Sequence, residues 1–259
     1  MRVASRRLRV ALPALAQKPR GKIVRRCRAT LQRIVRLAGP ARDLDVAFSL
    51  FREVPSPARA RGPHWSVLRR RLRESRRRSH ARFVQSLLDA DLASLRRDLR
   101  RVAARTPVES SVAQARLARR LAAERDRFIL GFRRLGDRLD VDALHALRRG
   151  VRRLRYIAEL QEELSRRVPR ASGSLKDLQD RLGSLRDVAI LARWLAAQAS
   201  RARRLRARAL ARVGSAGAKR LGVTVGELHA EFLDRTPLAV VSRVAGVSAP
   251  GPGIHFVRR

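Results

Sequence analysis

The sequence contains few of the residues that build disulfide, metal or base-stacking sites. Cys27 is the single cysteine among 259 residues, which excludes a disulfide framework and a zinc site built from several cysteines. The five histidines lack the spacings of a His-x-x-x-His or His-Glu-x-x-His motif, so we expect neither a bound metal nor a cofactor. Aromatic residues make up 4% of the chain, too few for a series of base-stacking platforms. No apolar run approaches the roughly 20 residues of a membrane span.

Acidic residues are also scarce relative to basic ones. The chain has 22 acids against 61 bases, a formal net charge of +39. Four of the bases are lysines, at positions 18, 22, 176 and 219, and the other 57 are arginines. The planar guanidinium matches phosphate oxygens in a bidentate way, so this excess predicts a polyanionic partner. An apolar content of 45% argues against a disordered basic tail and for a folded core.

The apolar residues recur with a helical period along most of the chain, which predicts an all-α fold. Gly39 and Gly183 are interpreted as helix ends, and Trp65 and Trp194 as core residues. Glycine and proline become frequent after position 212, which predicts a partly flexible tail over 213–259 with one short helix near 225–233. The expected helices are 1–18, 22–38, 42–53, 64–104, 109–136, 140–167, 174–184 and 186–212.

Two pairs of segments repeat each other in the same order. Residues 1–10 match 147–156 at an offset of 146, and residues 31–43 match 175–187 at an offset of 144. The difference of two residues fits a change in loop length. We therefore expect two related helical bundles, over 1–105 and 106–212.

The first helix of each repeat gathers basic residues on one side. In the second repeat the apolar stripe consists of Leu147, Val151, Leu154 and Ala158. The basic row on another side consists of His145, Arg148, Arg152 and Arg155, and the matching row in the first repeat of Arg2, Arg6 and Arg9. Like charges one turn apart destabilise a helix, and no acid interrupts the stretch 148–155, so the pattern favours an anion site over a solvated face.

Two details of this pattern have more than one interpretation. His145 follows two aspartates, Asp140 and Asp142, and either faces phosphate or helps to satisfy the start of its helix. The Arg-Asp pairs at 42–43 and 186–187 are equally open. Their carboxylates, Asp43 and Asp187, either lie in a first helical turn and interact with the helix dipole, or orient the neighbouring arginines.

The second repeat carries a recognisable motif. His145-Ala-Leu-Arg148 is followed by Arg-Arg-Leu-Arg-Tyr at 152–156, by Glu159, and by Leu-Lys, Leu-Gln, Leu-Gly and Arg-Asp pairs between 175 and 187. This arrangement resembles the CHAD family, the conserved histidine α-helical domain, over about residues 1–212. The resemblance implies two pseudo-symmetric, antiparallel four-helix bundles with a basic central groove. It also implies binding of inorganic polyphosphate and association with polyphosphate granules, and some members are linked to polyhydroxyalkanoate granules.

The resemblance also assigns site residues by position. The polyphosphate-binding residues it implies are Arg2, Arg6, Arg7, Arg9, His145, Arg148, Arg152, Arg153, Arg155 and Lys176. Further phosphate contacts are expected from Arg42, Arg149 and Arg186.

The first repeat departs from the family pattern. Its signature histidine would fall two residues before Met1, and Gln32 stands where the second repeat has Lys176. We therefore expect a first bundle that is incomplete at its N-terminus. The segment from Ser5 to Ala16 also looks like a twin-arginine export signal, but its apolar stretch is short and contains a proline, so export is not expected.

Three function classes are consistent with the charge. The leading interpretation is a non-catalytic, cytoplasmic polyphosphate-binding protein, attached to granules or organising them. One alternative is a basic helical protein that binds nucleic acid non-specifically, although helix-turn-helix spacing and stacking aromatics are missing. Another is an accessory or regulatory module of polyphosphate or triphosphate metabolism. Enzymatic activity is not expected, because the Glu-x-Glu-x-Lys motif of triphosphate-tunnel domains is absent, as is an obvious acidic cluster for Mg²⁺.

Overall fold

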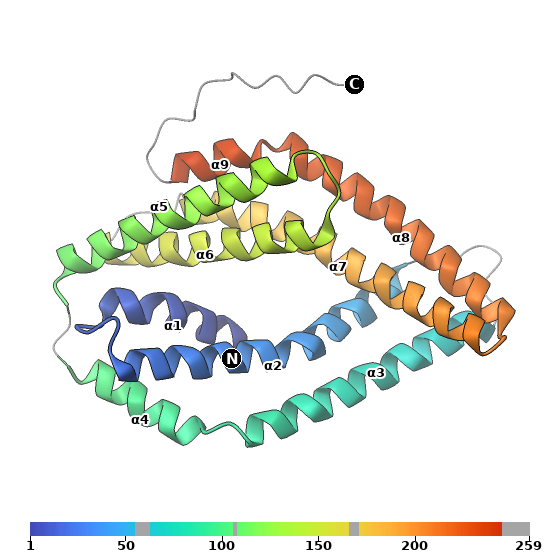
Figure 1. The fold of residues 1–259 in the computed structure, drawn as a ribbon, viewed down its shortest axis with the longest axis horizontal. Helices are drawn as coiled ribbons and strands as arrows, with labels where there is room; N and C mark the ends of the chain where they lie inside the picture. The colour runs from blue at the N-terminus through green and yellow to red at the C-terminus, as the bar shows by residue number, and fades with distance from the viewer. Residues whose placement is uncertain (55–62, 106–107, 166–170, 245–259) are drawn as a thin grey trace. The chain divides into compact units, whose positions relative to one another are not determined.

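The computed structural model describes residues 1–54, 63–105, 108–165 and 171–244, and the regular structure in these residues is entirely α-helical (Figure 1). This confirms the all-α prediction. The helices are α1 (Arg2–Leu15), α2 (Lys22–Glu53), α3 (Pro63–Leu88), α4 (Leu92–Ala103), α5 (Ser110–Leu135), α6 (Val141–Ser165), α7 (Ala171–Arg204), α8 (Arg208–Asp234) and α9 (Pro237–Val244).

The helices group into two compact units that are each discontinuous in sequence. Unit 1 comprises 1–109 and 183–230, and unit 2 comprises 110–182 and 231–259. This division differs from the consecutive bundles expected at 1–105 and 106–212. Because α7 contributes its first part to unit 2 and the rest to unit 1, a boundary in sequence does not separate the two units.

Two predicted breaks between helices are absent, and two predicted helices, 64–104 and 186–212, are each divided. The chain continues as helix through Gly39-Pro40 in α2 and through Gly183 in α7. A proline inside a helix costs one backbone hydrogen bond. The helix continues through Pro40 because it has buried residues on both sides of the proline, such as Ile34 before it and Phe51 after it. The predicted helix 64–104 is instead divided at 89–91, where the side chain of Asp91 caps α4 by accepting a hydrogen bond from Ser94 N at 2.8 Å.

The segment expected to begin a partly flexible tail is largely helical. α8 runs through position 212 to Asp234, and α9 follows it. The glycines of α8 allow close packing on α7. A Cβ on Gly214 would lie 3.2 Å from the Cβ of Ala199, and one on Gly217 would lie 3.1 Å from Leu195 Cδ1. The glycine content that predicted a loop therefore serves helix packing. The remainder of the expected tail, 245–259, lies outside the described residues.

Unit 1 has a core between α2, α3, α7 and α8. Leu68 and Leu72 of α3 are fully buried with Leu191 and Leu195 of α7. Both tryptophans pack against this cluster, and the Trp65 ring stacks on Phe51 with centroids 4.4 Å apart. The prediction that the tryptophans are core residues is therefore confirmed. A second cluster joins α1 to α2 and includes the single cysteine, Cys27, which is fully buried.

Unit 2 has its core along α5 and α6. The four residues predicted as the apolar stripe of α6 are all buried, none more than 5% exposed. Phe128 and Phe132 of α5 stack on each other with ring centroids 6.1 Å apart, and Phe132 meets Phe232 of α8 edge to face at 6.0 Å. The helical period read from the sequence therefore identifies the buried face of α6 correctly.

Buried or partly buried carboxylates connect the helices of unit 1. Asp98 of α4 is 3% exposed and accepts two hydrogen bonds from the Arg26 guanidinium of α2, one of them at 2.6 Å. These hydrogen bonds lower the pKa of Asp98. Burial works to raise the pKa of Asp45, but hydrogen bonds from Arg76 and His80 of α3 outweigh it and the pKa is lowered.

These lowered pKa values predict that acid destabilises unit 1. Folding favours the ionised carboxylates. Their contribution to the free energy of unfolding is therefore complete above the pKa of an aspartate in the unfolded chain, about 3.9. This stabilisation is lost as the pH falls through the lower pKa values of Asp45 and Asp98 in the folded protein. We expect the free energy of unfolding in urea to decrease steeply below about pH 4. The Asp98→Asn variant should be less stable at neutral pH and less sensitive to acid. An equal acid response in this variant and the wild type would contradict the assignment.

Candidate anion-binding site

The first helix of unit 1 presents one row of partly buried arginines. Arg2, Arg6 and Arg9 are each about one turn apart and partly buried, while Val10 and Leu12 turn into the core. Arg7, which the resemblance included in the site, is exposed and lies off this row. We call Arg2, Arg6 and Arg9 the α1 row.

Positive charge is concentrated around the start of the α1 row. Burial lowers the pKa of Arg2, and the nearby guanidinium of Arg6 lowers it further. Arg42 and Arg186 act in the same direction, and Asp43 opposes them. Among the described residues, the buried Nε atoms of Arg2 and Arg6 have no hydrogen-bond partner. Such donors are costly to leave unpaired, and an anion would satisfy them.

Asp43 positions one of these arginines. Its two carboxylate oxygens accept hydrogen bonds from Arg186 Nη1 and Nη2 at 2.9 and 2.7 Å. The interpretation that Asp43 and Asp187 lie in first helical turns is wrong, because both lie in the interior of long helices. Asp43 does orient an arginine, but it is Arg186 of the other Arg-Asp pair, 143 residues away. The structure thus brings Arg42 and Arg186, two of the secondary candidates, to the α1 row.

The second row lies on α6 in unit 2. His145, Arg148, Arg152 and Arg155 are partly buried, whereas Arg149 is exposed. We call the four partly buried residues, His145, Arg148, Arg152 and Arg155, the α6 row. Asp140 caps the start of α6, where its Oδ1 accepts hydrogen bonds from the backbone N–H groups of residues 142 and 143. The cap and the buried apolar stripe together fix the direction in which the row points.

Three residues that the resemblance placed in the unit 2 site have acidic partners. Arg153 Nε donates to Glu124 Oε2 at 2.7 Å, and Glu124 is only 5% exposed. Lys176 is exposed and pairs with Asp180 at 3.0 Å. Arg155 lies 3.5 Å from Glu159 and stacks on Tyr156. Arg153 therefore has a structural partner that the sequence motif did not indicate.

Sequence reasoning missed two residues of α2, one of which contacts the α1 row. Gln32 of α2 accepts a hydrogen bond from Arg9 Nη2 at 3.3 Å. The signal was available, since Gln32 is the repeat counterpart of Lys176. Arg28, one turn before Gln32 on α2, has a buried Nε without a hydrogen-bond partner among the described residues. No pattern in the sequence distinguished Arg28 from the many other arginines.

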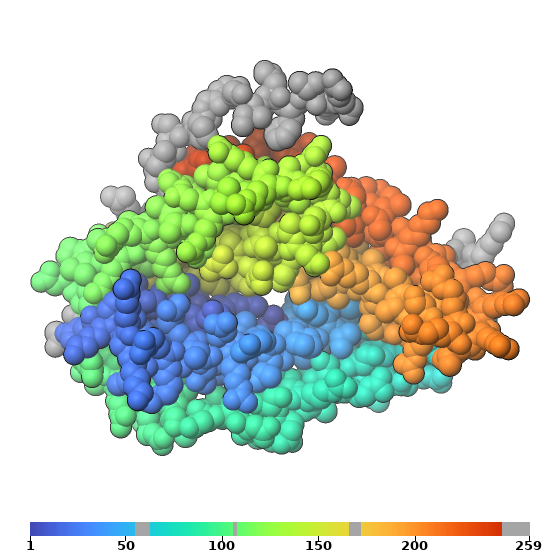
Figure 2. Space-filling view, in the orientation of Figure 1, coloured from blue at the N-terminus to red at the C-terminus, as the bar shows by residue number. Residues whose placement is uncertain are grey.

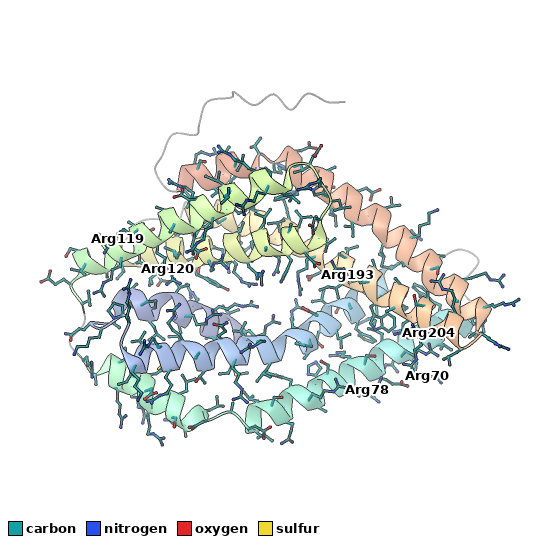
Figure 3. The ribbon with its side chains drawn as sticks, viewed as in Figure 1. Arg70, Arg78, Arg119, Arg120, Arg193 and Arg204 are labelled. Carbon is teal, nitrogen blue, oxygen red and sulfur yellow. The ribbon has the colours of Figure 1, made fainter. Side chains whose placement is uncertain are left out.

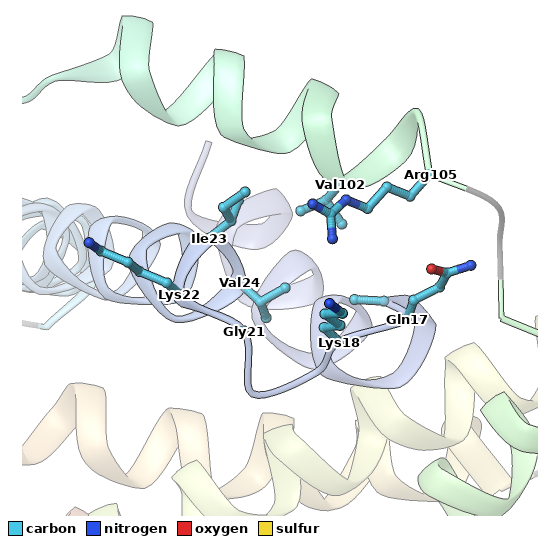
Figure 4. Close-up of a pocket in the computed structure, with 9 residues that line it drawn as sticks. Gln17, Lys18, Gly21, Lys22, Ile23, Val24, Val102 and Arg105 are labelled. Carbon is cyan, nitrogen blue, oxygen red and sulfur yellow. The ribbon is translucent and has the colours of Figure 1, made fainter.

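Two cavities in the described residues are lined in part by cations but not by residues of either row. One of about 230 Å³ is found where α1 turns into α2, and Lys18, Lys22 and Arg105 are among its lining residues (Figure 4). Figure 4 shows Arg105 extending from the end of α4 towards the first turn of α2. The other, of about 410 Å³, lies in unit 2 between α5 and α6 and is lined in part by Arg153. Both are bordered by cations.

Arginines are also abundant outside the rows. Figure 3 shows nitrogen-tipped side chains along the helices, including Arg70 and Arg78 on α3 and Arg193 and Arg204 on α7. Arg76 differs from its neighbours on α3. It is partly buried, bonds Asp45 at 2.6 Å and stacks on the Phe48 ring. The basic run of α3 thus contains both structural and freely exposed arginines.

The described residues contain neither a metal-ligand cluster nor a membrane-spanning helix. No cluster of three or more His, Cys, Asp or Glu side chains in that part of the chain is arranged to hold a metal ion. Within the same residues, none of the helices combines the length and apolar character that crossing a bilayer would need.

Comparison with known proteins gives one match. The family model described as CHAD domain matches residues 1–196, about three quarters of the chain. The comparisons with curated proteins and with solved structures each found no match. The matched segment contains the α1 row, the α6 row and Arg186, the arginine that Asp43 holds. The chain therefore belongs to the CHAD domain family.

Proposed function

We propose that this protein binds inorganic polyphosphate without hydrolysing it, and that the α1 row and the α6 row are its binding elements. The observation that carries the proposal is the environment of Arg2. Its guanidinium is partly buried among three other arginines and one carboxylate, and its Nε and that of Arg6 lack hydrogen-bond partners among the described residues. A bound phosphate would relieve both the repulsion and the missing hydrogen bonds.

The chemistry of the rows suits a phosphate polymer. Residues one turn apart on a helix lie about 5–6 Å from each other, so a row offers donors at regular intervals to a chain that carries charge at every unit. Each guanidinium can donate two parallel hydrogen bonds to phosphate oxygens. Binding would release counterions and would therefore weaken steeply with salt, by analogy with nucleic acids.

The α6 row favours polyphosphate over nucleic acid as the ligand. Proteins that hold single-stranded nucleic acid usually add aromatic rings on which bases stack. Tyr156 is the aromatic residue beside this row, and it is 5% exposed and in contact with Arg155. A buried ring offers no platform to a base. In the cell, the same binding would attach the protein to polyphosphate granules.

A competition experiment tests the proposal. Fluorescent long-chain polyphosphate is bound to the full chain at about physiological salt and displaced with unlabelled polyphosphate or duplex DNA at equal phosphate concentration. We expect polyphosphate to compete about tenfold more effectively than DNA. Equal competition would favour the nucleic-acid alternative. Release of phosphate in the presence of Mg²⁺ or Mn²⁺, above a protein-free blank, would contradict the non-catalytic part of the proposal.

A further inference from the structure

The outer face of α3 combines two features that the proposed function does not use. Beyond Leu72 no residue of α3 is buried, although the helix continues to Leu88. Towards its end Val84 is 53% exposed and Leu88 74% exposed, and Leu92 at the start of α4 is 39% exposed. Leu88 is the most exposed of the large apolar side chains in the described residues. Single exposed apolar residues are common, but Val84 and Leu88 lie one turn apart at the end of α3, and Leu92 follows directly after the bend, so exposed apolar side chains gather at this end of the helix.

Arginines lie on the same face of the helix. At 100° per residue, Arg70, Arg73 and Arg77 fall with Val84 and Leu88 inside an arc of about 60° around the helix axis. All three are exposed, and none of them forms a hydrogen bond or an ion pair among the described residues. We call Arg70, Arg73, Arg77, Val84 and Leu88 the α3 face. It is about 27 Å long, basic along its first part and apolar at its end.

The acids near the α3 face do not cancel its charge. Glu74 lies at its margin, and Asp89 and Asp91 occupy the bend after α3. Asp91 is engaged as the cap of α4, and Asp89 accepts a hydrogen bond from Gln85 at 3.3 Å. Arg78 and Arg82 of α3 and Arg96 of α4 are exposed close by, so the surroundings stay positive. The space-filling view shows the middle of α3 and its bend into α4 at the surface (Figure 2).

This combination selects one kind of partner. A phosphate polymer would engage the arginines but would leave Val84 and Leu88 in water. A second copy of the chain would bring another arginine-rich surface against this one, and the like charges would oppose association. A surface with anionic groups above an apolar layer satisfies both parts of the face. We propose that the α3 face binds an anionic lipid surface, with the arginines at the phosphate headgroups and with Val84, Leu88 and Leu92 at the boundary with the acyl chains.

A fluorescent probe tests whether the apolar end enters lipid. Cys27 is fully buried, so a thiol-reactive environment-sensitive dye labels the single exposed cysteine of a Leu88→Cys variant. Vesicles of phosphatidylglycerol and phosphatidylcholine should shift the emission to the blue and raise it about twofold. Pure phosphatidylcholine should have little effect. The matched control is Leu130→Cys on α5, where the side chain is 50% exposed and no shift is expected. An unchanged spectrum at position 88 would overturn the proposal.

A flotation assay tests the energetic role of the same residues. At about 0.5 M NaCl, where exposed charges are largely screened, the Val84→Gln/Leu88→Gln/Leu92→Gln variant should bind phosphatidylglycerol vesicles about tenfold more weakly than the wild type. The control variant Leu130→Gln/Leu139→Gln/Val223→Gln changes side chains of similar exposure and should bind within about twofold of the wild type.

The remaining outcomes separate this proposal from its competitors. Both triple variants should keep wild-type affinity for polyphosphate, so a failure of polyphosphate binding and a failure of lipid binding are distinguishable. Wild-type flotation of the Val84/Leu88/Leu92 variant would overturn the proposal. Loss of a concentration-dependent dimer in that variant, measured by light scattering, would identify a second copy as the occupant and would overturn it equally.

Discussion

Replacing Arg2, Arg6 and Arg9 together by glutamine is expected to lower the affinity for long-chain polyphosphate about a hundredfold at moderate salt. Each arginine is only partly buried, so its hydrogen bonds to phosphate contribute about 1 kcal/mol, or about 3 kcal/mol for the three, and the α6 row retains the rest of the binding. The slope of affinity against salt concentration should become shallower as well, because fewer counterions are released. Isothermal titration over a series of salt concentrations measures both effects.

The control for this experiment is taken from α3. Arg70, Arg73 and Arg77 are three exposed arginines of one helix face without partners among the described residues, so changing them to glutamine removes the same charge. We expect this change to lower the affinity for polyphosphate less than about threefold, because it alters only the overall positive potential of the protein. Arg76 is unsuitable as a control because its bond to Asp45 makes it structural. Equal losses from the two triple variants would mean that the site is not localised to the α1 row.

Replacing Arg153 by glutamine is expected to destabilise unit 2 by about 2 kcal/mol. The change leaves the buried carboxylate of Glu124 with one arginine, Arg127, instead of two. Breaking a fully buried pair costs more, but the Arg153 side chain is 42% exposed, and water weakens the interaction. The urea midpoint measures the effect, and the same change at the exposed Arg149 should leave the midpoint almost unchanged.

The binding behaviour of the Arg153→Gln variant is the second part of this prediction. The family motif places Arg153 among the phosphate ligands, whereas its geometry places it against Glu124. We therefore expect polyphosphate affinity to fall less than in an Arg148→Gln variant. A large loss of polyphosphate affinity with an unchanged urea midpoint would contradict this prediction and would identify Arg153 as a phosphate ligand.

Local patterns in the sequence were sufficient for the all-α class and for the buried face of α6. The helical period placed Leu147, Val151 and Leu154 in the core of unit 2, and it separated the exposed Arg149 from the partly buried Arg148. These features depend on residues within a few turns of one another. Periodicity can identify them without knowledge of the remainder of the chain.

Features that depend on distant residues could not be predicted in this way. The bond between Asp43 and Arg186 joins positions 143 residues apart, and no local pattern indicates it. The helix through Pro40 persists because of burial on both sides, which overrides the local preference. Gly214 resembled a loop residue because its tight contact with Ala199 of α7 was unknown. In each case tertiary packing decided between local alternatives.

The discontinuity of unit 1 has a consequence for the nascent chain. Leu68 and Leu72 are covered by α7 residues that belong to the stretch 183–230. At about 5–20 residues per second, a ribosome needs on the order of ten seconds after completing the first stretch to supply the second. During that interval an apolar, arginine-rich intermediate is held beside ribosomal RNA, whose phosphates attract it. Synthesis of this protein should therefore depend on chaperones that shield the first stretch until translation has passed position 230.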